Sequence, residues 1–447
     1  MKRVFIKTYG CQMNERDSES VAHDLVKNGY ELVESEKNAD VVLLNTCSVR
    51  EQAEQKAIGK AVQVLTSSKS EKKPTLGIMG CMAQNRGSEL SGKIPGVDLI
   101  VGTQKFHRVS EFLDKISSEK NHSTSEPLIS IDEEFGSQNT INQHLSSNLN
   151  QVSAFVSIMQ GCNMNCSFCI VPKTRGKERY REMEDICDEI KKLCDRGVRE
   201  VTLLGQIVNA YGRGVFSKKN GKTPFVQLLE KIHQIEGIDR IRFTSPHPTS
   251  YGSDLIESFG RLPKLCKYAH LPMQSGSDKI LKSMNRPYSK NRFLSIVDSL
   301  RTVSPGIRLS TDVIVGYPGE TETEFLETIN AFKQANFEMA FIFKYSERSG
   351  TPASKMDDQV PQKIKEERNQ LLLKLLEQQS YNSNLKLLNS RMKVLIESNA
   401  RKGRGDLMGR TECYRKVIFP GNQDLIGKIV TVTIKDVSST ILKGALI

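Results

Sequence analysis

The sequence predicts a multidomain α/β protein with three folded parts. The first is an open α/β sheet, the second a full or partial barrel of six β/α units, and the third a small β-barrel. Short apolar runs alternate with helical stretches over most of the chain, which is typical of parallel sheets. Near the C-terminus the pattern changes to β-rich runs divided by glycine-rich turns, which favours a small barrel.

Residues 1–116 are expected to form the open sheet. The apolar runs that predict its strands are Arg3–Tyr9, Val41–Thr46, Leu76–Gly80 and Leu99–Gly102. Each is bounded by polar or helix-compatible sequence. Residues 117–152 are rich in Ser and Asn and poor in apolar residues, so a linker is expected there.

Residues 153–378 are expected to form the central barrel of parallel strands, each followed by a helix. The predicted strands are Phe155–Met159, Glu200–Leu204, Arg240–Thr244, Tyr268–Leu271, Ser310–Val315 and Ala340–Tyr345. Apolar spacings of three and four predict helices at Asn291–Val303 and Phe325–Gln334. A long charged helix, Gln362–Leu388, leads into the last part of the chain.

Residues 379–447 are expected to form the small β-barrel, with strands at Met392–Glu397, Lys416–Phe419 and Lys428–Lys435. From Leu385 to Ile447 there are 12 Lys and Arg against 5 Asp and Glu. Much of the net charge of +12 therefore lies in this part. Such an excess is compatible with a nucleic-acid partner.

The composition also favours some function classes over others. We expect no membrane association and no secretory signal, because no apolar stretch approaches the length of a membrane span and the N-terminus lacks an apolar leader. A cytoplasmic location is expected. There, the ten cysteines are expected to serve metal binding or catalysis rather than disulfides.

Three cysteines with the spacing C-x3-C-x2-C follow the first predicted barrel strand: Cys162, Cys166 and Cys169. Three thiolates on one loop can hold three irons of a 4Fe–4S cluster and leave the fourth iron open. A structural zinc site is the weaker alternative, because it would need a fourth ligand and no further Cys or His lies nearby. Three incidental thiols are a second alternative.

This triplet, on the first of six β/α units, resembles the radical S-adenosylmethionine superfamily. The resemblance implies that S-adenosylmethionine binds the open iron and is cleaved to a 5′-deoxyadenosyl radical. It also implies that Phe168 lies beside the adenine, with a role in core packing as the alternative. Further cofactor contacts are expected from residues that follow later strands: Gly205, Gln206, Ser245, Gln274, Val315 and Gly316.

A second cysteine triplet lies in the N-terminal domain. Cys11, Cys47 and Cys81 each come directly after an apolar run. If these strands are parallel neighbours, the three thiols meet at one edge of the sheet, which suits a second cluster. Three independent buried cysteines are the alternative. The remaining cysteines are assigned to packing and not to metal: Cys187, Cys194, Cys266 and Cys413.

The pair of triplets resembles the methylthiotransferase family over nearly the whole chain, with a TRAM-type RNA-binding barrel at the C-terminus. The MiaB-type tRNA branch is most similar, on the motifs Thr8–Asn14, Phe155–Pro172 and Gly409–Thr411. That branch implies two 4Fe–4S clusters and S-adenosylmethionine used both as methyl donor and as radical source. The implied substrate is N6-isopentenyladenosine at position 37, in the anticodon stem–loop of tRNA, modified at C2. A reductant such as flavodoxin or ferredoxin and a monomeric state are also expected.

Two positions depart from the family pattern. Ile207 stands where a polar Asn is expected, and Lys173 where an aromatic is expected. A basic run follows the central triplet and is interpreted as a guide for RNA or as a solvated charge run: Arg175, Lys177, Arg179 and Arg181. In the last domain, Tyr414 and Phe419 could stack on bases or pack in the barrel.

Three rival functions stay open. The first is methylthiolation of threonylcarbamoyl-adenosine, which the Gln160–Asn165 loop disfavours. The second is methylthiolation of a ribosomal protein aspartate, which the basic C-terminal domain disfavours. The third is a non-enzymatic iron–sulfur protein that binds RNA, which the strand-end cofactor segments disfavour.

Overall fold

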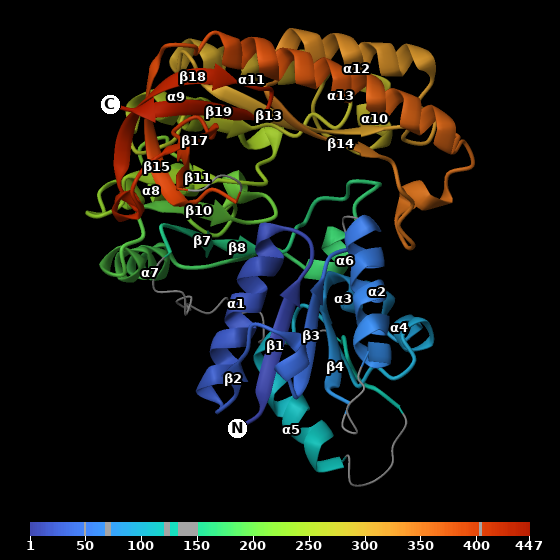
Figure 1. Cartoon of the computed structure of the whole chain (residues 1–447). Coiled ribbons are helices and arrows are strands. Elements are labelled where there is room, and N and C mark those ends of the chain that lie inside the picture. Colours follow the sequence, from blue (N-terminus) through green and yellow to red (C-terminus); the bar gives the residue numbers. More distant parts are fainter. Residues whose placement is uncertain (49–50, 68–72, 120–125, 133–150, 402–404) are drawn as a thin grey trace. The chain divides into compact units, whose positions relative to one another are not determined.

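The computed structural model describes residues 1–48, 51–67, 73–119, 126–132, 151–401 and 405–447 (Figure 1). The chain forms two compact units. The first contains Met1–Leu149, Met159–Met164 and Cys169–Arg181. The second contains Asn150–Ile158, Asn165–Phe168 and Glu182–Ile447. Among the described residues, no helix combines the length and the apolar character that crossing a bilayer requires.

The first unit is built on a parallel sheet with the strand order β2-β1-β3-β4-β5-β6. Its strands are β1 (Arg3–Thr8), β2 (Glu31–Leu32), β3 (Val41–Thr46), β4 (Thr75–Gly80), β5 (Leu99–Val101) and β6 (Leu128–Ser130). The four strands predicted for this domain are present. Strand β6 lies inside the segment expected to be a linker, where residues 120–125 and 133–150 fall outside the described residues.

Alternating side chains of β3 explain why helices cover both faces of this sheet. Val41 and Leu43 point to one face and Val42 and Leu44 to the other, as expected of a strand buried on both sides. One core lies under α1 (Gln12–Lys27) and α5 (Val109–Glu119). The other lies under α2 (Glu51–Ser67), α3 (Cys81–Arg86) and α4 (Glu89–Lys93). The open α/β sheet is therefore confirmed.

A later stretch of the chain completes the first unit. Strand β8 (Met159–Gln160) pairs antiparallel with β9 (Arg179–Tyr180). Between them lies the short helix α6 (Val171–Arg175), which packs against α3. The first unit is thus discontinuous in sequence.

The second unit carries six parallel strands in chain order. Three form one sheet: β7 (Ser153–Ser157), β10 (Glu200–Leu204) and β11 (Arg240–Phe243). Three form another: β12 (Tyr268–His270), β13 (Arg308–Val315) and β14 (Met339–Lys344). A parallel bridge from Ile241 to Leu265 connects β11 to the segment before β12. The predicted partial barrel is confirmed.

Helices follow the strands of this barrel. They are α7 (Met183–Asp195), α8 (Pro224–His233), α9 (Ser253–Arg261), α10 (Asp278–Ser283), α11 (Lys290–Val303) and α12 (Glu322–Ala335). Their buried residues recur at spacings of three and four, as in α12 with Phe325, Thr328 and Phe332. Helix α12 begins with a capping box in which Thr321 and Glu324 exchange hydrogen bonds.

Helix α13 (Gln362–Leu385) leads into a closed five-stranded barrel with the order β15-β16-β17-β19-β18. Its strands are β15 (Arg391–Asn399), β16 (Asp406–Thr411), β17 (Lys416–Pro420), β18 (Ile429–Val437) and β19 (Ile441–Leu446). The predicted small barrel is confirmed, with two strands, β16 and β19, that the sequence pattern had not indicated. Phe419 is buried in its core, so this aromatic packs and does not present a face for bases.

The turn between β16 and β17 is docked on the N-terminal ends of the α/β-barrel strands. Arg242 donates to the carbonyls of Thr411 and Glu412, each at 2.9 Å. Arg308 donates to the Tyr414 carbonyl at 2.9 Å. Backbone carbonyls of the turn therefore receive charged donors, which form the stronger class of hydrogen bond.

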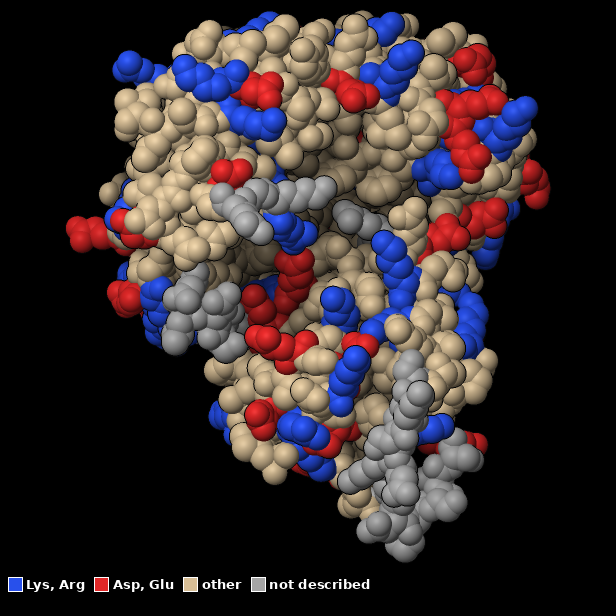
Figure 2. All heavy atoms as spheres, in the orientation of Figure 1, with Lys and Arg blue, Asp and Glu red and all other residues tan. Residues whose placement is uncertain are grey.

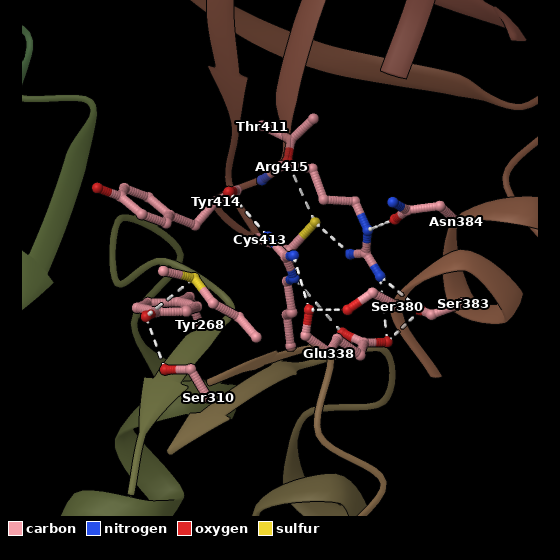
Figure 3. Close-up of polar contacts among 12 residues, drawn as sticks. Tyr268, Ser310, Glu338, Ser380, Ser383, Asn384, Thr411, Cys413, Tyr414 and Arg415 are labelled. Atoms are coloured by element: carbon pink, nitrogen blue, oxygen red, sulfur yellow. Dashed lines mark hydrogen bonds and ion pairs between the residues drawn. The ribbon is translucent and has the colours of Figure 1, made fainter. Parts of the chain in front are cut away.

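The side chains of this turn are engaged as well (Figure 3). The Tyr414 ring lies 5.0 Å from the Tyr268 ring, and the guanidinium of Arg242 lies over its face at 4.9 Å. Arg415 pairs with Glu338 at 3.1 Å and donates to Asn384 at 2.9 Å. Tyr414 thus packs between the two barrels, and base stacking by Tyr414 is not supported.

Candidate functional site

The N-terminal cysteines lie at the carboxyl ends of three adjacent parallel strands. Cys11 follows β1 and precedes α1, Cys47 follows β3, and Cys81 follows β4 as the first residue of α3. Strand β3 pairs with both β1 and β4, in registers that place Thr8 beside Asn45 and Thr46 beside Gly80. The edge of the sheet at which the sequence predicted that these thiols meet is therefore present in the fold.

Two glycines allow the chain to turn closely at these cysteines. Gly10 has φ +127°, and a Cβ on it would lie 2.4 Å from the Cys47 Cβ. Gly80 has φ +99°, and a Cβ on it would lie 2.4 Å from the Asn45 side-chain oxygen. At both positions, any other residue would have an unfavourable backbone conformation, and its Cβ would clash with a neighbouring residue.

The thiols of this site influence one another. A hydrogen bond from Cys47 lowers the pKa of Cys11 to about 6 against the opposing effect of burial, and the charge of Arg175 acts in the same direction as Cys47. Burial raises the pKa of Cys81, while the nearby Arg175 opposes that rise. Thiolates are the ligands that iron–sulfur clusters require, and the charge of Arg175 acts on two of these three cysteines.

Arg175 belongs to the basic run that was interpreted as an RNA guide or a solvated face. That interpretation is wrong for Arg175, which is 3 % exposed and ion-paired with Asp17 at 2.6 Å. It is also wrong for Arg181, which is buried. Arg179 is half-buried and donates to Gln160 at 2.7 Å. Only Lys177 of this run is exposed.

The central cysteine loop is divided between the units. Cys162 and Cys169 belong to the first. There, the Cys162 amide donates to the Gly176 carbonyl at 3.0 Å, and the Met164 amide donates to the Cys162 sulfur at 3.4 Å. The hydrogen bond to Gly176, which lies between α6 and β9, therefore fixes the loop backbone at Cys162.

Cys166 belongs to the second unit, where Arg286 donates to its sulfur at 3.4 Å. The neighbouring Ser167 bonds the Tyr317 hydroxyl and the Ser283 carbonyl, each at 2.8 Å. Phe168 is half-buried and packs against a small core that includes Met284. That packing is compatible with both roles predicted for Phe168.

The other predicted cofactor residues lie at carboxyl ends of barrel strands. Gly205 and Gln206 follow β10, Ser245 follows β11, Gln274 follows β12, and Val315 ends β13 before Gly316. Ser245 has φ +58° and Gln274 has φ +63°, conformations that non-glycine residues adopt at a cost of order 1–3 kcal/mol and mostly at functional sites. At Gly316 the space that a Cβ would fill is taken by Lys365 of α13, 2.4 Å away.

Two buried polar atoms at these strand ends suit a polar ligand. The side-chain oxygen of Gln206 and Nε2 of His247 have no hydrogen-bond partner among the described residues. Burial lowers the pKa of His247 to about 3, and the charges of Arg286 and Arg213 act in the same direction. A neutral imidazole and an amide oxygen that lack partners fit the amino and carboxylate groups of S-adenosylmethionine.

Sequence reasoning missed three residues of this region: Arg175, Arg286 and His247. Arg175 lay within a charge run, a pattern that normally indicates a solvated face. Arg286 lies more than a hundred residues from Cys166, and no local pattern links the two. His247 lies two residues after the predicted Ser245, yet only the fold reveals that its Nε2 lacks a partner among the described residues.

Family models match three stretches of the chain. The model described as uncharacterized protein family UPF0004 matches residues 3–102. The radical SAM superfamily model matches residues 156–332, and the TRAM domain model matches residues 386–447. The first match covers β1 to β5 of the open sheet, the second covers most of the α/β barrel but ends before β14, and the third covers the closed β-barrel.

Full-length relatives decide the family. A tRNA-2-methylthio-N(6)-dimethylallyladenosine synthase of Opitutus terrae is 52% identical over 100% of this chain and 98% of its own length. Proteins with the same name from Methylacidiphilum infernorum and Akkermansia muciniphila are 48% and 46% identical, each over 99% of this chain and over 94% and 98% of their own lengths. The chain belongs to the tRNA-2-methylthio-N(6)-dimethylallyladenosine synthase family.

Solved structures support the fold of this synthase family member. A radical S-adenosylmethionine methyltransferase, TsrM, from Kitasatospora setae aligns with a TM-score of 0.59 at 12% identity, over 79% of this chain and 75% of that one. The cobalamin-dependent S-adenosylmethionine radical enzyme OxsB aligns with a TM-score of 0.53 at 11% identity, over 85% of this chain and 56% of that one. At these identities the likeness concerns fold alone.

Radical SAM membership implies a 4Fe–4S cluster and S-adenosylmethionine. The donor set fits that cluster, because soft thiolates of a C-x3-C-x2-C loop are its usual ligands. The partnerless atoms of Gln206 and His247 fit the polar groups of the cofactor.

Proposed function

We propose that this protein adds a methylthio group to C2 of N6-dimethylallyladenosine (isopentenyladenosine) at position 37 of tRNA. One observation carries the proposal. A chain that matches the radical SAM model also places Cys11, Cys47 and Cys81 at the ends of three adjacent strands. The names of its full-length relatives support the substrate.

We assign the radical cluster to Cys162, Cys166 and Cys169. When bound, the cluster supplies the electron that cleaves S-adenosylmethionine. Arg286 holds the Cys166 sulfur, and Gln206 offers an acceptor for the cofactor's amino group. The strand-end residues that we expect to orient the methionine and adenine parts, with Phe168 beside them, are Gly205, Ser245, Gln274, Val315 and Gly316.

We assign a second 4Fe–4S cluster to Cys11, Cys47 and Cys81, where it would supply the sulfur. Three protein thiolates leave one iron of such a cluster open. The hydrogen bond between Cys47 and Cys11 and the buried Arg175 favour ionised thiols, the form that binds iron. Gly10 and Gly80 keep these sulfurs close to the strand ends.

The anticodon stem–loop of tRNA is the proposed RNA partner, and the closed β-barrel its proposed docking module. This part of the chain carries an excess of Lys and Arg, whereas Figure 2 shows Lys and Arg interspersed with Asp and Glu over much of the face in view. Phosphate contacts by exposed lysines would give affinity. We further propose a flavodoxin or ferredoxin reductant, a monomeric state and a cytoplasmic location.

Iron content tests the two clusters. The anaerobically reconstituted protein should hold about eight irons, as two 4Fe–4S clusters require. Replacing Cys162, Cys166 and Cys169 with Ala should halve the iron and abolish cleavage of S-adenosylmethionine. Replacing Cys11, Cys47 and Cys81 should also halve the iron, yet leave that cleavage in place. Cleavage by the first triple variant would refute the assigned radical site.

The substrate is tested by mass spectrometry of tRNA nucleosides before and after incubation with the reduced protein and S-adenosylmethionine. A methylthio gain on isopentenyladenosine is the expected result. A gain on threonylcarbamoyl-adenosine instead would assign the chain to the sister tRNA activity. A gain on ribosomal protein added to the same reaction, read by peptide mass spectrometry, would assign it to the other sister activity. If the reaction yielded neither a methylthiolated product nor 5′-deoxyadenosine, the chain would be a non-enzymatic iron–sulfur protein.

A further inference from the structure

Arg175 is held rigidly within the first unit. It is the last residue of α6, which packs against α3, the helix that begins at Cys81. The Thr103 hydroxyl donates to the Thr174 carbonyl and fixes the helix next to the loop after β5. The guanidinium therefore occupies one defined position beside the N-terminal cysteine site.

The contacts of Arg175 are all buried. Its Nη2 lies 2.6 Å from an Asp17 carboxylate oxygen and donates to the Asn14 side-chain oxygen at 2.9 Å. Its charge opposes the rise in the pKa of Cys81 that burial causes, and it lowers the pKa of Cys11. Asp17 is 4 % exposed and Asn14 fully buried. The Arg175 cation is thus paired with a single buried carboxylate, and its charge acts on two cysteines of the triplet.

The Asn14 side chain is oriented so that its oxygen faces Arg175. The Asn14 amide nitrogen donates to the Tyr9 carbonyl at 3.0 Å, which turns its oxygen toward Arg175. The Cys11 thiol lies 3.6 Å from the same oxygen. The Asn14 side-chain oxygen therefore connects Arg175 to Cys11.

Stability alone does not account for the buried pair of Arg175 and Asp17. A buried ion pair is about neutral relative to apolar residues of similar volume, because desolvation offsets the attraction. The potential of an iron–sulfur cluster, in contrast, depends directly on local charge and on hydrogen bonds to its sulfurs. A cation beside thiolate ligands favours the reduced cluster, which carries one more negative charge.

We propose that Arg175 is a positioning residue of the site formed by Cys11, Cys47 and Cys81. Its guanidinium is connected to Cys11 through the side-chain oxygen of Asn14, and its charge raises the reduction potential of the cluster bound there. Asp17 offsets part of that charge and so sets the potential. This inference rests on the proposed second cluster.

The test uses the full chain with Cys162, Cys166 and Cys169 replaced by Ala, so that the remaining iron reports the N-terminal site. Midpoint potentials are measured by redox titration with electron paramagnetic resonance. Arg175→Gln should shift the ratio of oxidised to reduced cluster at least tenfold toward oxidised, which is about 59 mV more negative for a one-electron couple. Asp17→Asn should shift the potential in the positive direction.

A double variant tests whether the charges of Arg175 and Asp17 offset each other. The double variant Arg175→Gln/Asp17→Asn should lie between the two single variants, because both charges are removed. Arg175→Lys retains the charge and should stay near the unsubstituted protein. Since Asp17→Asn keeps the guanidinium, the sign of its shift tests the proposal even where Arg175→Gln lowers the yield of folded protein.

A matched pair on the same sheet provides the control. Arg3 and Asp40 form an ion pair at 3.3 Å at the amino end of the strands, and Arg3→Gln and Asp40→Asn change charge by the same amounts. Neither should move the potential. Shifts of equal sign for Arg175→Gln and Asp17→Asn, or shifts no larger than those of the controls, would overturn the role of Arg175. Absence of iron in the triple-Ala background would overturn the second cluster itself, and this inference with it.

Discussion

Gly10 and Gly80 each precede a cysteine of the N-terminal site, and each lacks room for a side chain. Gly10→Ala should therefore displace Cys47, and Gly80→Ala should displace the Asn45 side chain. We expect each variant to lose about half of its iron while it still cleaves S-adenosylmethionine. Iron analysis of the reconstituted protein checks this.

Gly29 offers a matched control for the backbone strain. It also has positive φ, +83°, but a Cβ on it would meet no heavy atom within 4 Å. Gly29→Ala should cost about 1 kcal/mol of stability from its backbone conformation and leave the iron content unchanged. Equal iron loss in Gly29→Ala and Gly10→Ala would show that steric contact is not the cause.

His247 should make the second unit sensitive to mild acid. Its pKa is about 3 in the fold and about 6.5 in an unfolded chain. Between these values the unfolded chain binds one more proton, so stability falls as pH decreases through this window, by about 1.4 kcal/mol per pH unit. In His247→Gln, the free energy of unfolding should differ less between pH 7.5 and pH 5.5 than it does in the unsubstituted protein. Unfolding is followed by circular dichroism, because the chain has no Trp. An unchanged difference would contradict this.

At single residues, the strand-end positions of Cys11, Cys47 and Cys81 were predictable from sequence, because each cysteine follows an apolar run. Arg175 and Arg286 were not. Each acts on a cysteine that is distant in sequence, and a buried arginine looks like any surface arginine until the fold places its partner.

The turn between β16 and β17 is the element that joins the two barrels of the second unit. Arg415 is 6 % exposed and pairs with Glu338, Ser383 and Asn384. Arg415→Ala should leave Glu338 short of a buried partner and reduce stability by about 3–5 kcal/mol. Thermal unfolding followed by circular dichroism measures the loss.

Arg391 is the matched control for this element, because it begins β15 and is exposed. Arg391→Ala should change stability by no more than about 0.5 kcal/mol. Equal stability of the two variants would mean that the Arg415 network contributes nothing to the attachment of the β-barrel.

Among whole elements, the strands with continuous apolar runs were predictable, and β3 and β10 match their predicted bounds. Strands β16 and β19 were missed because each contains a glycine, a residue that lowers strand propensity. A Cβ at Gly409 would lie 2.3 Å from the Leu395 carbonyl oxygen, and one at Gly444 would lie 2.3 Å from Val432. Neighbouring strands of the closed barrel approach these two positions so closely that only glycine fits. Local strand propensity does not reveal this requirement, because it depends on residues distant in sequence.

At the scale of the whole molecule, RNA binding and radical chemistry should be separable. Exposed cations of β15 and β18 include Arg391, Lys393 and Lys435. Changing all three to Gln should weaken tRNA binding and make it less dependent on salt, since each lost phosphate contact removes about 0.7–0.9 from the log–log slope. Cleavage of S-adenosylmethionine should be unchanged.

Filter binding across a salt series measures these slopes. Lys191 of α7 and Lys363 and Lys374 of α13 are exposed lysines outside the β-barrel, and their replacement by Gln is the control. If both triple variants reduced the slope equally, the β-barrel would not be the docking module.

The discontinuity of the first unit has a consequence for biosynthesis. Residues up to 149 supply all three N-terminal cysteines, whereas Arg175 and its helix come from Cys169–Arg181. A ribosome that has released only the first 149 residues has therefore delivered these cysteines without the cation beside them. Under the role proposed for Arg175, a cluster built before residue 181 has emerged would have a lower reduction potential than a cluster in the complete first unit.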